Sequence, residues 1–359
     1  MSENMKIVAD ENLAFTDYFF AEFGEIHQAA GRTLTQADVK DAKTLLVRSV
    51  TKVNAELLQH TAVQFVGSAT IGTDHLDIDA IEKQGAVWAN AAGCNAQAVS
   101  EYVMTALLHL RPELLKAEQQ FTLGIVGLGN VGRRLAKMAS LLGWRVIGTD
   151  PFVQHETVTQ VSFTELLAQA DAISIHVPLT QEGEHPTYHL FNAETLQQMK
   201  PKAILINSAR GPAIEESALL ADIAQTGRTV VLDVFEHEPL ISEQLLNAVT
   251  LVTPHIAGYS LEGKARGTQM IYQAFCSHFQ KEAHKTFESQ LPSCAQYFEQ
   301  KALKIALAEH LQQIYPILED DQKLRACLKD GKVEQSAFDY LRKTYPLRRE
   351  WAAHGGPQA

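Results

Sequence analysis

The sequence lacks the features that mark several classes of protein. It contains no apolar run of about 18 residues, so a membrane-spanning helix is not expected. Its four cysteines are widely spaced without a CxxC pair, which indicates neither a disulfide framework nor a zinc site. The start has no basic region followed by an apolar stretch and a cleavage site, so secretion is not expected. These absences favour a reduced, cytoplasmic setting, and no metal is expected.

The chain also lacks an excess of positive charge. It carries 31 Lys and Arg against 42 Asp and Glu, a formal net charge of −11. A nucleic-acid surface needs clustered Lys and Arg to displace the counterions of phosphates. We therefore expect a small-molecule ligand, with neither nucleic acid nor a membrane as a partner.

What is present is an alternation of strand-like and helical segments. Four apolar runs within residues 6–91 are separated by helical patterns, which predicts βαβ units around a parallel sheet. Six nearly all-apolar runs follow, at 123–129, 145–150, 171–178, 203–209, 229–235 and 250–256. Strands covered on both faces by helices have this composition. Six of them predict an α/β fold with a complete doubly wound dinucleotide-binding sheet.

A chain of 359 residues should divide into two or three domains. A helical pattern near 96–115 joins the two strand series, and another after Tyr259 returns the chain to the first domain. The segment from residue 284 lacks the strand rhythm and ends in the basic run LRKTYPLRREW. The predicted domains are residues 1–95 plus 257–283, residues 96–256, and a small α-rich or mixed domain at 284–359.

The run GIVGLGNVG at 124–132 predicts a dinucleotide site. Gly127, Gly129 and Gly132 have the GxGxxG spacing between a strand and a helix. These glycines permit a tight turn, the approach of a pyrophosphate and close packing of the helix on the strand. The first helical amides, at Asn130 and Val131, would then face the phosphates. The alternative is a chance match, since this spacing alone is a weak signal.

Asp150 ends the next strand-like run, about 20 residues after the glycines, where a carboxylate can accept hydrogen bonds from ribose hydroxyls. It would repel a 2′-phosphate, and Pro151 and Phe152 supply no cation, so NAD is favoured over NADP. The alternative is an Asp in a surface turn before proline. His176 ends a later run and could lie near a ribose or be a buried, hydrogen-bonded histidine.

Arg210, Glu238 and His255 each follow the end of an apolar run, at the edge where parallel sheets bind ligands. Oxidation of an alcohol by hydride transfer needs a base for the hydroxyl proton and a group that fixes the substrate. Histidine titrates near neutral pH, a carboxylate can hold its tautomer, and the Arg fork suits a carboxylate. Each residue taken alone would be expected on the surface, and only their combination predicts catalysis.

The segments NSARG (207–211), DVFEHEP (233–239) and PHIAG (254–258) resemble motifs of the D-isomer-specific 2-hydroxyacid dehydrogenase family over about the first 280 residues. The resemblance implies a flavodoxin-like substrate domain and a Rossmann NAD-binding domain. It implies that Arg210 binds and polarises the substrate, Glu238 tunes the histidine and His255 is the acid/base. It also assigns further residues to the cofactor: Val177, Asp233 and Gly258.

Further segments resemble one branch of this family, whose members oxidise 4-phospho-D-erythronate with NAD in vitamin B6 biosynthesis. They are VRSVTKV (47–53), GTDHLD (72–77), GCNAQAVSEYV (93–103), HIAGYSLEGKARGT (255–268) and RREW (348–351). The resemblance implies that the C-terminal domain mediates homodimerisation, and it places Ser49, Thr70 and Tyr259 at the substrate. Arg48 could meet the substrate carboxylate or phosphate, or form a structural salt bridge.

Three questions stay open at this point. Arg348 and Arg349 are interpreted as a basic solvated tail, with binding of a phosphate in a partner's active site as the alternative. The substrate could be another hydroxy acid, such as phosphoglycerate. The chain could also be an NAD-sensing binding protein like the corepressors built on this fold, because fold alone does not settle function.

Overall fold

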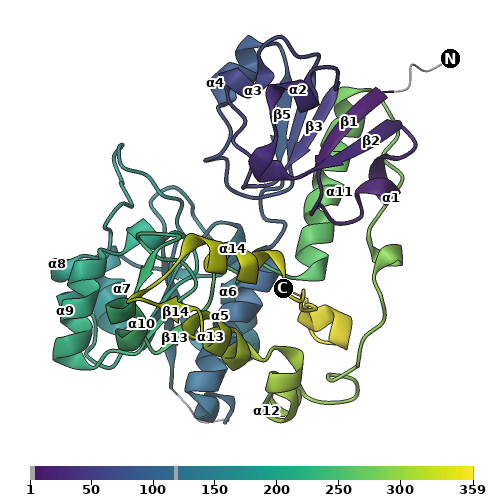
Figure 1. The fold of residues 1–359 in the computed structure, drawn as a ribbon. Helices are drawn as coiled ribbons and strands as arrows, with labels where there is room; N and C mark the ends of the chain where they lie inside the picture. The colour runs from purple at the N-terminus through teal and green to yellow at the C-terminus, as the bar shows by residue number, and fades with distance from the viewer. Residues whose placement is uncertain (1–4, 117–119, 359) are drawn as a thin grey trace. The chain divides into compact units, whose positions relative to one another are not determined.

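The computed structural model describes residues 5–116 and 120–358, which form two compact units (Figure 1). The first unit combines residues up to Asn95 with Ser260–Ser293, and the second combines Ala96–Tyr259 with Cys294–Ala359. The segment expected as a third domain from residue 284 therefore divides between the units. Its first residues, to Ser293, group with the first unit and the rest with the second.

The first unit contains a five-stranded parallel sheet with the order β2-β1-β3-β4-β5. This 2-1-3-4-5 order is the flavodoxin-like arrangement, as predicted. The strands are β1 (Met5–Asp10), β2 (Gly24–Ala29), β3 (Thr44–Val47), β4 (Phe65–Ser68) and β5 (Val87–Asn90). Strand β2 was not predicted, because as an edge strand it has the polar, half-exposed sequence GEIHQA instead of an apolar run.

Helices cover both faces of this sheet because successive strand residues point to opposite sides. Ile7 and Leu46 pack with α1 and α11, whereas Val8 and Leu45 pack with α2, α3 and α4. The helices are α1 (Thr16–Phe20), α2 (Gln36–Val39), α3 (Ala55–Leu58), α4 (Ile78–Lys83) and α11 (Leu261–His278). Helix α11 is the returning helix predicted after Tyr259.

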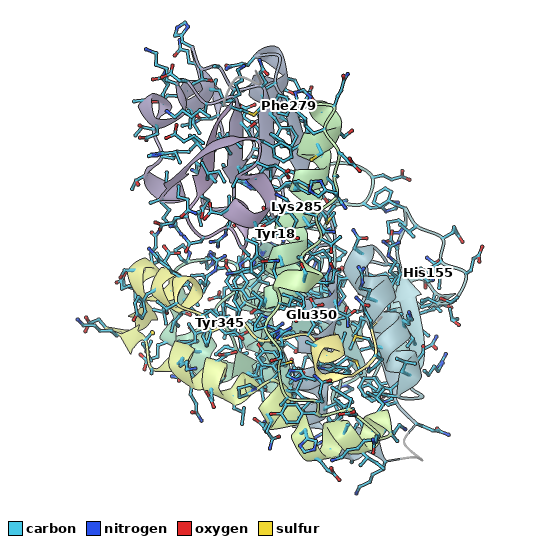
Figure 2. The ribbon with its side chains drawn as sticks, turned by 90° about the vertical axis from the view of Figure 1, so that its right-hand side faces the viewer. Tyr18, His155, Phe279, Lys285, Tyr345 and Glu350 are labelled. Atoms are coloured by element: carbon cyan, nitrogen blue, oxygen red, sulfur yellow. The ribbon has the colours of Figure 1, made fainter. Side chains whose placement is uncertain are left out.

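The segment that follows α11 stays on the first unit. Lys285 Nζ donates to the Tyr18 carbonyl oxygen at 2.8 Å and lies 5.6 Å from the Tyr18 ring centroid (Figure 2). Phe287 joins the same core as α1 and α11. A short 3-10 helix, Glu288–Gln290, follows.

The second unit contains a seven-stranded parallel sheet with the order β13-β11-β10-β9-β6-β7-β8. All six predicted strands are present, and the short β8 extends the β7 edge. The order corresponds to the doubly wound arrangement 3-2-1-4-5-6 with one strand added. The strands are β6 (Thr122–Val126), β7 (Arg145–Thr149), β8 (Thr159–Gln160), β9 (Ala172–Ile175), β10 (Ile204–Asn207), β11 (Val230–Leu232) and β13 (Leu251–Val252).

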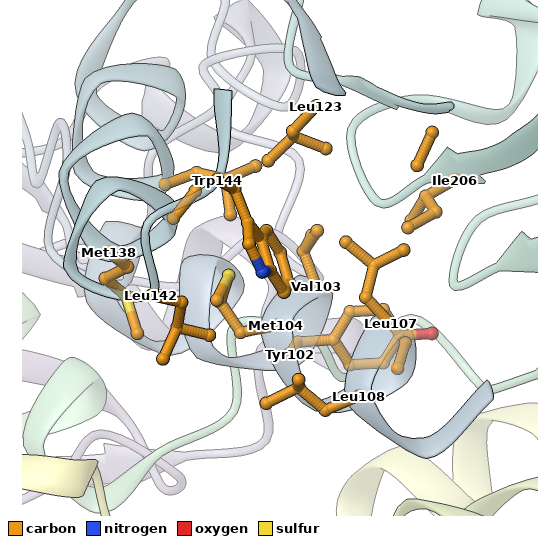
Figure 3. Close-up of a cluster of buried hydrophobic side chains, with 14 of the residues drawn as sticks. Tyr102, Val103, Met104, Leu107, Leu108, Leu123, Met138, Leu142, Trp144 and Ile206 are labelled. Atoms are coloured by element: carbon orange, nitrogen blue, oxygen red, sulfur yellow. The ribbon is translucent and has the colours of Figure 1, made fainter. Parts of the chain in front are cut away.

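Helices α5 and α6 cover one face of this sheet, where Tyr102, Leu107 and Trp144 pack near Leu123 and Ile206 (Figure 3). Helix α5 is buried along almost its whole length. Helices α7 to α10 cover the other face. The bounds are α5 (Ala96–Leu110), α6 (Asn130–Leu141), α7 (Phe163–Gln169), α8 (Ala193–Gln198), α9 (Glu216–Thr226) and α10 (Glu243–Ala248).

The C-terminal domain is mixed, as predicted, and packs against both cores of the second unit. It comprises α12 (Leu303–Ile314), α13 (Ile317–Arg325), β14 (Leu328–Lys329), β15 (Lys332–Val333) and α14 (Gln335–Lys343). Its hairpin pairs with β12 (Ile241–Ser242) in a three-stranded antiparallel sheet. The Val252 amide of edge strand β13 donates to Asp321 Oδ1 at 2.8 Å. The C-terminal domain thus supplies a hydrogen-bond partner for a backbone amide at the edge of the sheet.

Among the helices described here, none has the length and apolar character needed to cross a membrane.

Candidate active site

The sheet of the second unit gathers the predicted cofactor and catalytic residues at one edge. Because all its strands are parallel, their carboxyl ends lie on the same side. Three catalytic candidates follow three neighbouring strands: Arg210 follows β10, Glu238 follows β11 and His255 follows β13. Cofactor candidates follow the adjacent strands β6, β7 and β9.

The glycine turn between β6 and α6 has the geometry expected of a pyrophosphate site. Gly127 has φ +94, and a Cβ there would lie 2.5 Å from the His176 carbonyl oxygen. At Gly132 a Cβ would overlap the Gly127 carbonyl oxygen, so the helix packs closely on the turn. At Gly129, by contrast, a Cβ would meet no described atom within 4 Å.

Helix α6 begins at Asn130, directly after Gly129, so the open space lies at a helix N-terminus. The first amides of a helix have no partner within it and attract anions. The Asn130 and Val131 amides are among them. The turn therefore fits a dinucleotide pyrophosphate.

Asp150 holds this turn and the end of β7 together. Its Oδ2 accepts from the Leu128 amide at 2.8 Å, and its Oδ1 accepts from the Phe152 amide at 2.9 Å. The carboxylate is thus both a turn residue and a neighbour of the glycine turn, and the two interpretations of Asp150 are compatible. An ionised carboxylate has about four lone-pair sites, which leaves capacity for a ribose hydroxyl.

Glu238 and His255 form a close pair. His255 Nδ1 lies 2.9 Å from Glu238 Oε2, and both side chains are partly exposed. Glu238 Oε1 accepts from the Phe235 amide at 3.0 Å, which orients the carboxylate. Burial would raise the pKa of Glu238, but the charge of His255 and its hydrogen bond hold that pKa below its usual value. A histidine fixed in this way can exchange a proton through its other ring nitrogen.

Asp233 organises the loop that carries His255. It accepts from Thr253 Oγ1 at 2.6 Å and from the Ile256 and Ala257 amides at 2.8 and 2.9 Å. Tyr102 Oη lies 2.8 Å from Thr253 Oγ1 and extends the network into α5. Burial raises the pKa of Asp233 to about 6. Sequence patterns did not reveal Thr253 and Tyr102, because their role depends on a contact between residues 151 positions apart.

Arg210 lies in a loop that is fixed by its backbone. Asn207 Nδ2 donates to the Arg210 carbonyl oxygen at 2.9 Å. At Gly211 a Cβ would overlap the Phe235 carbonyl oxygen, so the loop after β10 contacts the loop that carries Glu238. The absence of a side chain at Gly211 therefore lets the loop with Arg210 and the loop with Glu238 pack against each other.

The remaining candidates of the second unit are His176, Val177, Gly258 and Tyr259. His176 Nε2 lies 2.8 Å from Ser174 Oγ, and burial lowers the pKa of His176 to about 3. His176 is thus hydrogen-bonded and partly buried, as its second interpretation requires in part. Val177 lies beside the glycine turn. Gly258 and Tyr259 follow His255 and are partly buried.

The substrate candidates of the first unit lie at the carboxyl ends of β3 and β4. Arg48 Nη1 lies 3.8 Å from Asp10 Oδ1, so the salt bridge foreseen as an alternative is present. Ser49 is exposed. Thr70 Oγ1 lies 2.8 Å from Ser68 Oγ, which in turn lies 2.9 Å from His75 Nε2. Burial lowers the pKa of His75. Ser68 and His75 were not predicted, although His75 belongs to the quoted GTDHLD segment.

The interpretation of Arg348 as part of a basic solvated tail is wrong. Arg348 is only 8% exposed, and its guanidinium donates to main-chain carbonyl oxygens of its own chain. A basic run predicts solvation only when nothing covers it, and here α5 and the loop after His255 surround the side chain. Arg349 is partly buried.

Comparison with family models gives two matches. Residues 101–257 match "D-isomer specific 2-hydroxyacid dehydrogenase, NAD binding domain". The matched residues include the glycine turn and the Glu238–His255 pair. Residues 293–354 match "Domain of unknown function (DUF3410)". The second match covers most of the C-terminal domain described above.

Solved structures share the fold. The TT0316 protein from Thermus thermophilus has a TM-score of 0.67 at 26% identity, covering 78% of this chain and 99% of that one. The NAD+-bound 3-phosphoglycerate dehydrogenase of Entamoeba histolytica has a TM-score of 0.66 at 23% identity, covering 77% and 96%. These likenesses show that the chain shares the fold of these proteins.

A curated relative extends the likeness over the whole chain. Erythronate-4-phosphate dehydrogenase of Acinetobacter baumannii is 68% identical over 355 residues, which cover 99% of this chain and 100% of the relative. The match includes the first unit and the C-terminal domain. The chain therefore belongs to the erythronate-4-phosphate dehydrogenase family, within the D-isomer-specific 2-hydroxyacid dehydrogenases.

Proposed function

We propose that the protein oxidises the C2 hydroxyl of 4-phospho-D-erythronate, giving 2-oxo-3-hydroxy-4-phosphobutanoate, in vitamin B6 biosynthesis. The substrate is taken from the relative that is 68% identical over nearly the full length. The observation that carries the chemistry is the Glu238–His255 pair, at 2.9 Å, at the same edge of the sheet as a glycine turn that fits NAD. NAD, when bound, supplies the hydride acceptor.

His255 is the acid/base in this proposal. If Nδ1–H donates to Glu238 Oε2, then Nε2 carries a lone pair and can take the proton of the substrate hydroxyl. The negative charge of Glu238 stabilises the imidazolium that results. In the reverse reaction the same nitrogen returns the proton to the carbonyl oxygen.

Arg210 binds the substrate carboxylate and polarises C2, because its planar fork matches two carboxylate oxygens. Ser49, Thr70 and Tyr259 contribute hydroxyl groups to the polyol phosphate. Arg48 is a weaker candidate, since it already faces Asp10 at 3.8 Å. Ser49 and Thr70 belong to the first unit and Tyr259 to the second.

NAD is proposed to bind along the edge described above. The pyrophosphate faces the turn at Gly127, Gly129 and Gly132 and the amides of Asn130 and Val131. Asp150 accepts from the adenosine ribose. Val177, Asp233 and Gly258 are proposed around the nicotinamide half.

We also propose a homodimer formed through the C-terminal domain, in the cytoplasm. Exposed apolar side chains on that domain support self-association, with Ile305 53% and Tyr340 66% exposed. The four cysteines are free, as a reducing compartment requires. Sedimentation velocity of Tyr340→Ser against the unaltered protein tests the dimer.

The direct test of the activity is incubation of the purified protein with 4-phosphoerythronate and NAD, with or without a 2-oxo acid to reoxidise the cofactor. We expect the keto product by mass spectrometry. Faster turnover of 3-phosphoglycerate would refute the assigned substrate. A cellular role that survives Arg210→Ala, with turnover abolished, would instead support an NAD-sensing binding protein.

A further inference from the structure

The C-terminal domain contacts both loops that carry the acid/base pair. Glu238 lies in the loop at 235–240, between β11 and β12, and His255 begins the loop at 255–259. Each loop has an irregular backbone, so each needs contacts from outside to fix its side chain. For both, several of these contacts come from residues after 330.

The loop with Glu238 is held on both sides of that residue. Before it, the Phe235 ring packs edge-on against Phe338 of α14, with centroids 6.4 Å apart. After it, β12 pairs with β15 through Ile241 and Val333. The C-terminal domain therefore fixes the loop that presents the Glu238 carboxylate.

The loop with His255 is held by Arg348. Its Nη1 donates to the carbonyl oxygens of Ile256 and Tyr259, both at 3.1 Å. Its Nη2 donates to the carbonyl oxygens of Ala257 and, at 2.9 Å, of Ala98 in α5. The Tyr345 ring packs against Tyr259, with centroids 6.0 Å apart (Figure 2 labels Tyr345). One buried guanidinium thus joins the loop after His255 to the core of the second unit.

Arg342 contacts the loop with His255 directly, through Tyr259, and reaches the loop with Glu238 through Phe338, which packs on Phe235. Its Cζ is 5.6 Å from the Phe338 ring centroid and 5.9 Å from that of Tyr259. Burial opposes its charge, yet the Tyr259 phenol and the Glu238 carboxylate keep the pKa of Arg342 above its usual value. Reciprocally, burial raises the pKa of Glu238, and the larger influence of His255 together with the smaller one of Arg342 keeps that pKa low. Arg342 therefore contributes a positive charge beside the pair.

We propose that the C-terminal domain positions the Glu238–His255 pair, with Arg348 fixing the His255 loop and Arg342 setting the charge beside Glu238. Both arginines are positioning residues, since they act through the pair and not on the substrate. The inference rests on the proposed function, and it gives the domain a role that dimerisation alone does not include.

The sign of the charge effect follows from the groups around the pair. Glu238 is negative, Asp233 is negative only above its pKa of about 6, Tyr259 is a phenol and Arg342 is positive. Removal of the positive charge makes uptake of a proton by the pair more favourable. Because oxidation needs the pair without that proton, the acidic limb of the pH profile should move to higher pH.

The test compares Arg342→Met, Arg342→Gln and Arg342→Lys in the full-length protein. Met keeps the aliphatic stem that packs on Phe338, Gln keeps a donor for Tyr259, and Lys keeps the charge. The matched control is Lys329→Met, which removes an exposed positive charge from the same domain. We expect both neutral variants to shift the acidic limb of kcat/KM upward by about 0.5 to 1 pH unit. Arg342→Lys and Lys329→Met should stay within about 0.2 units of the unaltered protein.

A second measurement does not depend on turnover. NMR titration of the free protein, with ¹³C-labelled glutamate and Glu238 assigned from Glu238→Gln, should show an upward shift of the Glu238 pKa in the neutral variants. An unchanged titration midpoint in Arg342→Met and Arg342→Gln would overturn the proposal. So would an equal shift in Lys329→Met, because the effect would then be one of net charge.

Arg348→Lys tests the positioning of the loop. A Lys can reach fewer of the four carbonyl oxygens, so amide hydrogen exchange at 255–259 should quicken at least tenfold, with kcat reduced and KM little changed. Exchange that quickens equally throughout the second unit would overturn the positioning role and assign Arg348 to overall stability. Failure of the proposed function can be told apart from failure of this inference. If only the proposed function fails, the unaltered protein lacks turnover, but the titration and hydrogen-exchange differences between the variants are still observed.

Discussion

The second and third glycines of the turn allow substitutions that separate the needs of the fold from the needs of NAD. At Gly132 a Cβ would lie well under 3.0 Å from the Gly127 carbonyl oxygen and 3.1 Å from Ile125 Cγ2. The first contact is with backbone, so no side-chain rotation relieves it. At Gly129 φ is −69, and a Cβ would meet nothing within 4 Å among the described residues.

We expect Gly132→Ala to lower the free energy of unfolding by about 1–3 kcal/mol, the usual cost of forcing a methyl group into a packed site. Gly129→Ala should change it by less than about 1 kcal/mol, because the φ suits alanine and the unfolded chain loses entropy. The same methyl group would occupy the space proposed for the pyrophosphate. We therefore expect NAD binding to weaken at least tenfold, or about 1.4 kcal/mol.

Urea unfolding and calorimetric titration with NAD measure the two effects on the same samples. Gly129→Ala serves as the control for the stability effect at Gly132. If Gly129→Ala binds NAD as tightly as the unaltered protein, the placement of the pyrophosphate is wrong. If both variants lose the same stability, the steric argument at Gly132 is wrong.

Three further predictions concern single carboxylates and the acid/base. His255→Gln and Glu238→Gln should lower kcat about 100- to 10,000-fold with NAD affinity within about twofold, and a parallel loss of NAD binding would contradict their roles. Asp150→Asn should lower the ratio of the NADP dissociation constant to the NAD dissociation constant at least about tenfold, because the charge that repels a 2′-phosphate is gone. Asp233 has a pKa of about 6 when folded against 3.8 in the unfolded chain, so its stabilising contribution is complete below pH 4 and lost as pH rises through 6. The unfolding free energy of the unaltered protein relative to Asp233→Asn should thus fall by on the order of 2–3 kcal/mol between pH 4 and pH 7, and a constant difference would refute the assignment.

The C-terminal arginines show where sequence patterns stop being informative. The basic run LRKTYPLRREW predicts solvent exposure, but Arg348 is buried against carbonyl oxygens from two distant segments. Strand β2 shows the same limit, since its half-exposed sequence has no apolar run. In both cases burial depends on neighbours far away in the chain, and composition does not record them.

The sequence by itself determined the elements whose signals are local. A buried parallel strand must be apolar on both faces, a pyrophosphate turn must contain glycines at fixed spacing, and both requirements are satisfied within about ten residues. Only the tertiary structure decided which distant residues meet, such as Arg348 with Ala98 and Arg342 with Tyr259, because packing brings together residues that no local pattern links.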